Sequence, residues 1–149
     1  MTALNPDRIL VPIDFSEACR PALAEAAGLA KVRGAPLTLL HVHQIETIAF
    51  LDFTYVEPPE KLADLCDAAE KQLASWRAEL VPEGVEAEVK VVTGSPVSEI
   101  INLSGEHDLI VMATHGRTGL DHFLMGSVAE RVVQAARCSV LIVKGGGGA

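Results

Sequence analysis

Short apolar runs alternate with stretches of helical periodicity along the whole 149-residue chain. The runs that predict strands are Arg8–Ile13, Pro36–Val42, Val85–Val92, Asp108–Ala113 and Ser139–Val143. The stretches that predict helices are Ser16–Arg33, Glu60–Leu80, Pro96–Leu103 and Ser127–Ala136. Strands that alternate with helices indicate βαβ units with right-handed crossovers. We therefore predict an α/β fold with a five-stranded, mostly parallel sheet.

The apolar pattern also predicts where each strand lies in the sheet. The first and fourth strands contain unbroken apolar runs, Ile9–Val11 and Leu109–Met112, which are typical of strands covered on both faces. In the third strand apolar and charged residues alternate from Val85 to Val91, which indicates an edge strand with one wet face. The last strand is wholly apolar, although a doubly wound sheet places it at or near an edge. Because an uncovered apolar edge favours aggregation, we predict a homodimer through Ser139–Val143.

The predicted helices differ in the side chains that they turn toward the sheet. The first helix presents small residues at helical spacing, namely Ala18, Ala22, Ala26 and Ala30, which lets it lie close to the strands. The helix from Glu60 presents a larger stripe, which we interpret as core: Leu62, Leu65, Cys66, Ala69, Leu73, Trp76 and Leu80.

The connection Gln44–Pro59 predicts a long loop without secondary structure. It contains Phe50, Phe53 and Tyr55, and loops of this length are functional or disordered. A lid, a dimer contact and a surface flap all remain open. At the other end, the glycine run Gly145–Gly148 predicts a flexible tail, so that one domain occupies residues 1–144 and the tail residues 145–149.

Charge and cysteine content narrow the classes of partner and compartment. With 12 basic and 20 acidic residues the net charge is −8, which argues against nucleic acid or an anionic membrane as partner. Cys19, Cys66 and Cys138 lie far apart and form no CxxC pair, which favours a reduced compartment. The N-terminal segment Met1–Arg8 does not resemble a signal peptide, and the apolar runs are too short to span a membrane. We expect a cytoplasmic protein.

The carboxyl ends of the first and fourth strands are where a doubly wound sheet binds ligands. They carry the segments Pro12–Ser16 and Met112–Gly116. Asp14 follows the first strand, where a carboxylate can accept hydrogen bonds from ribose hydroxyls. Capping of the following helix is the alternative, and Ser16 could also do it.

The segment from Ala113 to Ser127 predicts a cradle for the phosphates of a nucleotide. It contains three glycines and leads into the N-terminus of a helix, where free N–H groups favour anions. Arg117 can add a charge-assisted contact. Ser127 and Glu130 also fit a capping box, which would explain Ser127 without any ligand. Spacing alone leaves both interpretations open, and the segment is not a P-loop.

Other candidate chemistry is weaker. His41 and His43 lie on one face of a strand end, but two ligands are too few for a structural zinc site. His115 lies beside the predicted phosphates, where an imidazole could act as an acid. The cysteines are interpreted as packing residues, and no hydrolase, metalloprotease or kinase motif is present.

At these residues the chain resembles the universal stress proteins of the UspA superfamily, over nearly its whole length. The segments that carry the resemblance are Ile9–Ser16, Leu39–Val42, Gly94–Pro96, Thr114–Leu120, Gly126–Glu130 and Cys138–Val143. The resemblance implies a five-stranded parallel sheet of order 3-2-1-4-5 with helices on both faces, and a dimer formed through the last strand.

The resemblance also implies the ATP-binding branch of that superfamily, whose motif is Gly, two residues, Gly, nine residues, Gly, then Ser or Thr. Gly116, Gly126 and Ser127 match its later elements, whereas Ala113 replaces the first glycine. Because Ala113 ends a strand, we expect a negative φ there and tolerance of the extra methyl group.

By this resemblance Asp14 would contact ribose, and the backbone of Val42 would face adenine. Gly126, Ser127 and Val128 would bind the phosphates, with Mg²⁺ offsetting the triphosphate charge. The predicted nucleotide site comprises Pro12, Ile13, Asp14, Val42, Met112, Ala113, His115, Gly116, Arg117, Gly126, Ser127 and Val128.

These residues favour a nucleotide-dependent regulatory module in a stress response, in which ATP alters a surface read by a protein partner that the sequence does not identify. One alternative is a dimeric interaction or holdase-like module that binds no nucleotide, which Ala113 favours. Another is a slow ATPase or phosphotransferase, with weak hydrolysis or autophosphorylation, although no general base or lysine is evident.

Overall fold

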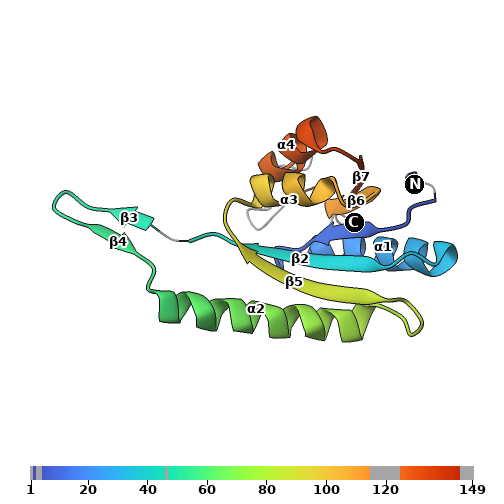
Figure 1. Ribbon diagram of the computed structural model, residues 1–149, viewed down its shortest axis with the longest axis horizontal. Helices are drawn as coiled ribbons and strands as arrows, with labels where there is room; N and C mark the ends of the chain where they lie inside the picture. The colour runs from blue at the N-terminus through green and yellow to red at the C-terminus, as the bar shows by residue number, and fades with distance from the viewer. Residues whose placement is uncertain (1, 3–4, 46, 115–124, 145–149) are drawn as a thin grey trace.

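A computed structural model describes residues 2, 5–45, 47–114 and 125–144 of the chain. These residues contain seven strands and four helices, joined by loops and turns (Figure 1). The strands are β1 (Ile9–Pro12), β2 (Leu37–His43), β3 (Thr47–Ala49), β4 (Thr54–Val56), β5 (Ala87–Thr93), β6 (Leu109–Ala113) and β7 (Ser139–Val143). The helices are α1 (Cys19–Arg33), α2 (Pro59–Leu80), α3 (Pro96–Ser104) and α4 (Ser127–Ala135). All the predicted elements are present, with ends displaced by a few residues. None of these described helices is long and apolar enough to cross a membrane.

Five parallel strands form the central sheet in the order β5-β2-β1-β6-β7. Counted along the parallel strands alone this is the order 3-2-1-4-5, so the predicted fold class is confirmed. Helices α1 and α2 cover one face of the sheet, and α3 and α4 cover the other (Figure 1). Strand order reverses at β1, which lies between β2 and β6.

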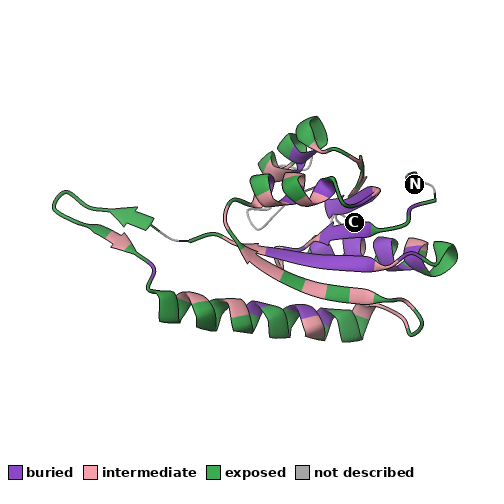
Figure 2. Ribbon diagram, in the orientation of Figure 1, coloured by how far each residue is buried: buried purple, intermediate pink, exposed green. Residues whose placement is uncertain are grey.

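The two-residue period of the strands divides the core between the two faces. Ile9 and Val11 of β1 pack with buried alanines of α1 and with Leu73 and Trp76 of α2. Leu10, on the opposite face, packs with Ile100 of α3 and with α4. Both clusters are buried (Figure 2). The predicted alanine face of α1 is confirmed by the burial of Ala22, Ala26 and Ala30.

Both edges of the sheet match the sequence pattern. Strand β5 buries none of its residues completely, and Glu88 and Lys90 are exposed on its wet face. Strand β7 pairs only with β6, and Leu141 on it is 42% exposed. An apolar strand therefore forms the other edge, as predicted.

The connection between β2 and α2 corrects the prediction of a loop without secondary structure. Thr47–Ala49 and Thr54–Val56 pair in antiparallel register as a two-stranded hairpin. It projects beyond the carboxyl end of the sheet, away from both helical layers (Figure 1). β-Branched and aromatic residues on both sides of a short turn account for the pairing.

Helix α2 corrects the prediction of a continuous core stripe. Ala69, Leu73 and Trp76 are buried, but Leu65 is exposed and Leu62 and Cys66 are only half-buried. The apolar stripe continues over the first turns of the helix, where no sheet lies beneath it in the described structure (Figure 2). Helical periodicity thus predicted the face correctly but not the extent of its cover.

Candidate functional site

Strands β1 and β6 part at their carboxyl ends, at the point where the strand order reverses. Strand β1 pairs with β2 as far as Pro12, but with β6 only at Ile9 and Leu10. Strand β6 nevertheless continues to Ala113 and keeps its pairing with β7. Because the two strands are parallel, the predicted residues at their carboxyl ends lie at the same end of the sheet. Open α/β sheets bind ligands at this position.

Ile13 anchors the segment that follows β1. Its side chain is buried, its N–H donates to the carbonyl of Leu40 at 2.7 Å, and its own carbonyl accepts from Nδ1 of His41 at 2.8 Å. Because a carbonyl only accepts, Nδ1 of His41 carries a proton. His41 thus positions the backbone beside Asp14, and its ring is committed to this contact.

Asp14 organises a tight turn with its Oδ1 atom. This oxygen accepts from the N–H of Ser16 at 2.9 Å and from Sγ of Cys19 at 3.1 Å. This turn delays the start of α1 until Cys19, a few residues after the start at about Ser16 that the sequence predicts. Ala18 is the N-cap, with no side-chain cap, so neither Asp14 nor Ser16 caps the helix.

Phe15 lies at the centre of this turn in the left-handed region, with φ of 65°. A bulky residue there is strained and is held by its surroundings. The ring centroid of Phe15 is 4.6 Å from that of His41 and 5.6 Å from that of Trp76, the latter edge-on. The Arg20 guanidinium lies 4.6 Å from the centre of the Trp76 ring. Aromatic packing thus fixes the conformation that presents Asp14.

Cys19 is a functional candidate that the sequence analysis interpreted only as packing. Burial raises the pKa of its thiol to about 11, and the Asp14 carboxylate adds to the rise. The thiol therefore stays protonated and donates to Asp14. The signal in the sequence was a cysteine five residues after Asp14, the aspartate that follows the first strand. A cysteine at this spacing reaches the carboxylate only if the chain turns between the two residues.

Val42 presents its backbone to the space where β1 has ended. Along β2, Leu40 accepts from Ile13 on the β1 side, whereas His43 accepts from Gly94 on the β5 side. Backbone groups of alternate residues in a strand point the same way, so those of Val42 point to the β1 side. Strand pairing with β1 stops at Leu40.

At the end of β6, Met112 and Ala113 are buried on opposite faces of the sheet. Phe15 is the one non-glycine residue of the described chain with a positive φ, so the expected negative φ of Ala113 is confirmed. Beyond Ala113, the carbonyl of Thr114 accepts from the N–H of Gly126. This bond holds the start of α4 against the end of β6.

Helix α4 corrects the predicted capping box. Gly126 is the N-cap and Ser127 is the first helical residue, with no side-chain cap on the helix. Ser127 is exposed, while Gly126 and Val128 are half-buried. Without a serine cap, the first N–H groups of α4 keep their capacity to donate to an external acceptor.

The remaining predicted residues, His115, Gly116 and Arg117, lie outside the described residues. The structure brings the other nine to one end of the sheet, on or next to four separate elements. Segments at the ends of β1 and β6 contribute Pro12, Ile13, Asp14, Met112 and Ala113. Val42 comes from β2, and Gly126, Ser127 and Val128 come from the start of α4.

The described residues contain no group of three or more metal-ligating side chains. His41 is hydrogen-bonded to a carbonyl, and Nε2 of His43 donates to Oε2 of Glu57 at 3.0 Å.

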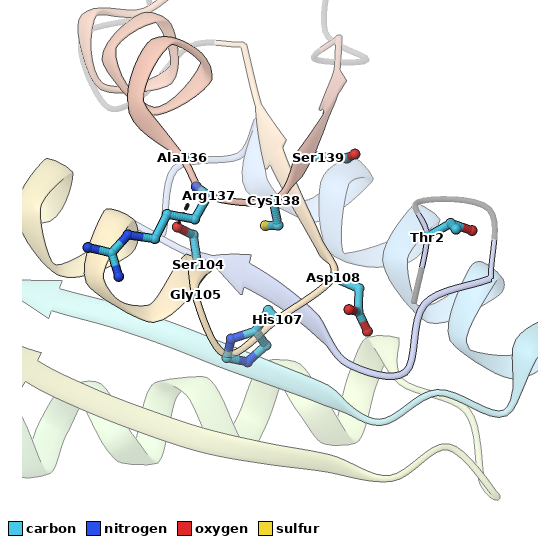
Figure 3. A pocket seen from close by; sticks show the side chains of 9 residues that line it. All are labelled: Thr2, Ser104, Gly105, His107, Asp108, Ala136, Arg137, Cys138 and Ser139. Carbon is cyan, nitrogen blue, oxygen red and sulfur yellow. Dashed lines mark hydrogen bonds between the residues drawn. The ribbon is translucent and has the colours of Figure 1, made fainter.

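A hollow of about 710 Å³ opens at the opposite end of the sheet, next to the amino ends of β6 and β7 (Figure 3). His107 donates from Nδ1 to the Leu103 carbonyl and bonds through Nε2 to Thr38. Ser104 accepts from the Arg137 N–H at 2.9 Å. Burial, followed by the Asp108 charge, raises the pKa of the Cys138 thiol. The polar groups of His107 and Ser104 are thus bonded within the domain, and the Cys138 thiol is not activated as a nucleophile. We therefore do not assign the candidate site to this hollow.

A doubly wound sheet with an uncapped helix at its switch point defines a class of α/β domain suited to phosphorylated ligands. The sequence profile of the universal stress protein family matches residues 6–144. The chain therefore belongs to the universal stress protein family.

Individual relatives agree along almost their full length. The universal stress protein YxiE of Bacillus subtilis is 33% identical over 147 residues, covering 93% of this chain and 99% of its own. The solved structure of MJ0577, from Methanocaldococcus jannaschii, superposes with a TM-score of 0.78 at 27% identity, over 95% of this chain and 97% of that one. A universal stress protein in complex with cAMP superposes with a TM-score of 0.69 at 21% identity, over 95% and 99% of the two chains.

Proposed function

We propose that this chain binds an adenine nucleotide, ATP with Mg²⁺, at the carboxyl ends of β1 and β6. The observation that carries the proposal is the hydrogen bond between Gly126 and Thr114, which sets the uncapped start of α4 against the end of β6. A helix N-terminus at the switch point of a doubly wound sheet attracts phosphate. The solved family member that holds cAMP supports an adenine nucleotide as the ligand class.

Each part of the proposed site has a separate role. The N–H groups of Ser127 and Val128 and the Ser127 hydroxyl bind phosphate oxygens next to Gly126, whose own N–H donates to Thr114. His115, Gly116 and Arg117 are assigned to the phosphates in this proposal by their positions in the sequence. The Asp14 carboxylate accepts from the ribose hydroxyls, next to Pro12 and Ile13. The outward backbone groups of Val42 pair with the adenine edge, and Met112 and Ala113 line the sugar. Mg²⁺ would offset the charge of the phosphate chain.

The bound nucleotide acts in this proposal as a switch and not as a substrate. Binding changes the surface around the end of β6 and the start of α4, and a protein partner reads that surface. A homodimer through β7 presents two such surfaces together. Location in the cytoplasm, where ATP is abundant, completes the proposal.

Isothermal titration of the whole chain with Mg-ATP tests the proposal. Gly126 has φ of −58°, a value open to any residue, so Gly126→Val adds bulk without backbone strain. We expect the variant to bind at least about tenfold more weakly, because its β-branched side chain crowds the phosphate position. Gly28→Val is the matched control, since a Cβ at that exposed position meets no atom within 4 Å.

A second candidate function is an interaction module that binds no nucleotide. Ala113 favours it, because this buried residue adds a methyl group beside the proposed sugar position. Restoring the glycine separates the two. If Ala113→Gly gains ATP binding that the parent chain lacks, the interaction module is the function of this chain. If both bind, the nucleotide-binding function holds.

A further inference from the structure

The hairpin of β3 and β4, residues 47–56, forms an arm with one apolar face. Thr47 pairs with Val56, Ile48 with Tyr55 and Ala49 with Thr54. Since directly opposed residues share a face and alternate pairs share the same face, Ile48 and Tyr55 lie on one side with Phe50 and Phe53. The rings of Phe50 and Phe53 stack with their centroids 4.5 Å apart, which confirms their common side. We call Ile48, Phe50, Phe53 and Tyr55 the aromatic face of the arm.

The opposite face of the arm has a different character. It carries Thr47, Ala49, Thr54 and Val56. The arm is therefore amphipathic in the manner of a strand pair with one side on a core, although all of its residues except Tyr55 are exposed (Figure 2). Phe50 and Phe53 are 53% and 62% exposed. A two-stranded ribbon is only marginally stable in water, so this arm lacks the layer that its aromatic face requires.

The base of the arm is anchored at the point where it leaves the sheet. The Glu57 side chain is 1% exposed and accepts from His43 at 3.0 Å. Helix α2 begins two residues later with a proline in its first turn. The arm consequently projects in a defined direction (Figure 1) and presents its aromatic face outside the body of the domain.

We propose that the aromatic face docks against the same face of a second copy of this chain. A two-fold axis brings Ile48, Phe50, Phe53 and Tyr55 of one copy against those of its partner, as two layers of strands about 10 Å apart. Each copy carries a net charge of −8, so most surfaces repel their own image. The aromatic face has no charged side chain, and Asp52 lies in the turn beyond it. Self-docking there avoids like-charge contact.

The size of the face predicts a weak, concentration-dependent contact. Four half-exposed side chains of this kind remove on the order of 400 Å² per copy from water, about half of a standard interface. This contact is separate from β7, on the far edge of the sheet, and requires no nucleotide. A chain that makes both contacts, through β7 and through the aromatic face, forms assemblies larger than a dimer.

Sedimentation velocity on the whole chain tests the proposal in a Leu141→Asp background, which places a charge on the exposed edge strand β7. In that background we expect dimers at about 100 µM, with dissociation on dilution. Adding Phe50→Asp and Phe53→Asp should halve the mass to that of a monomer. Adding Thr47→Asp and Thr54→Asp gives the matched control, because it places the same charges on the opposite face and should leave the dimer intact.

The proposal is overturned if the background chain is monomeric at the highest concentration, or if both pairs of substitutions have the same effect. Binding of the arm to lipid vesicles or to an unrelated protein, with the chain itself monomeric, also overturns it. Hydrogen exchange on the chain without substitutions gives an independent readout. Amides of residues 47–56 should exchange several-fold more slowly at high protein concentration than at low, and equal rates contradict the docking.

Discussion

The Sγ atom of Cys19 lies 3.1 Å from Oδ1 of Asp14 and donates its proton to that oxygen. The same oxygen accepts from the N–H of Ser16. A buried thiol thus holds a carboxylate at the carboxyl end of β1, at the switch point of the sheet. The aspartate turn and the start of α1 form one unit, joined by side-chain hydrogen bonds instead of a conventional helix cap.

The pKa of Cys19 predicts a pH dependence of stability. Burial, then the Asp14 charge, raises it from 9.0 to about 11 in the folded chain. The folded state therefore holds the proton more tightly than the unfolded state, so this stabilisation is present below pH 9 and is lost as the pH rises toward 11. A shift of about two units corresponds to about 2–3 kcal/mol.

Denaturant unfolding between pH 8 and 11 measures this loss. The Cys19→Ala chain lacks the titrating thiol, so the difference in unfolding free energy between the parent and this variant should shrink as the pH rises. A difference that stays constant over this range would show that the thiol does not titrate as the buried partner of Asp14.

The left-handed conformation of Phe15 predicts an unusual order of substitutions. Both Phe15→Ala and Phe15→Gly lose the contacts of the ring with His41 and Trp76, so both should be less stable than the parent. At φ of 65° alanine keeps the backbone strain and glycine does not. We expect the glycine variant to be more stable than the alanine variant by about 1 kcal/mol. Thermal unfolding monitored by circular dichroism gives the order, and the reverse order contradicts the strained turn.

The exposed edge of β7 predicts that a single charge disrupts strand pairing between copies. Leu141→Asp should shift the chain toward species of half the mass, because a charge on an edge strand opposes pairing between copies. Val32→Asp on α1 is the control, since Val32 is 78% exposed but lies on a helix. Light scattering after size-exclusion chromatography measures both masses. Equal masses for the two variants would remove β7 from the assembly.

The bond between His43 and Glu57 predicts that the arm depends on one anchor. Glu57→Ala should speed amide exchange in residues 47–56 by about tenfold or more, because a hydrogen bond to a charged group contributes about 1.5–3 kcal/mol. Glu57→Gln keeps an acceptor for His43 and should retain most of the protection. Amides of β1 serve as the internal reference and should not change. A uniform rise across the chain would instead report global destabilisation.

Much of the fold was predictable because it depends on local period and burial. Unbroken apolar runs predicted that β1 and β6 lie inside the sheet, and alternation predicted β5 at an edge. The capping box at Ser127 and Glu130 was predicted wrongly, because Gly126 holds the cap position through its backbone bond to Thr114. The spacing of Ser127 and Glu130 is a local signal. Gly126 and the last residue of β6, Ala113, are thirteen residues apart along the chain.

The site was predictable as a set of positions but not as a set of contacts. The carboxyl ends of parallel strands lie together in any doubly wound sheet, so Asp14 and Ala113 could be placed at one edge. The proton donated by Cys19 and the ring of Phe15 over His41 require a turn whose φ value the sequence does not specify. A long-range partner, Trp76 on α2, stabilises that turn.

The sequence by itself determined the class of fold, the order of its elements and the faces that each buries, since periods of two and 3.6 residues are local properties of the chain. Tertiary structure decided the hairpin between β2 and α2, the uncovered start of α2 and the role of Cys19. Each of these features depends on contacts between segments that are distant in the sequence. Packing and desolvation across the whole domain decide those contacts, so a short stretch of sequence cannot predict them.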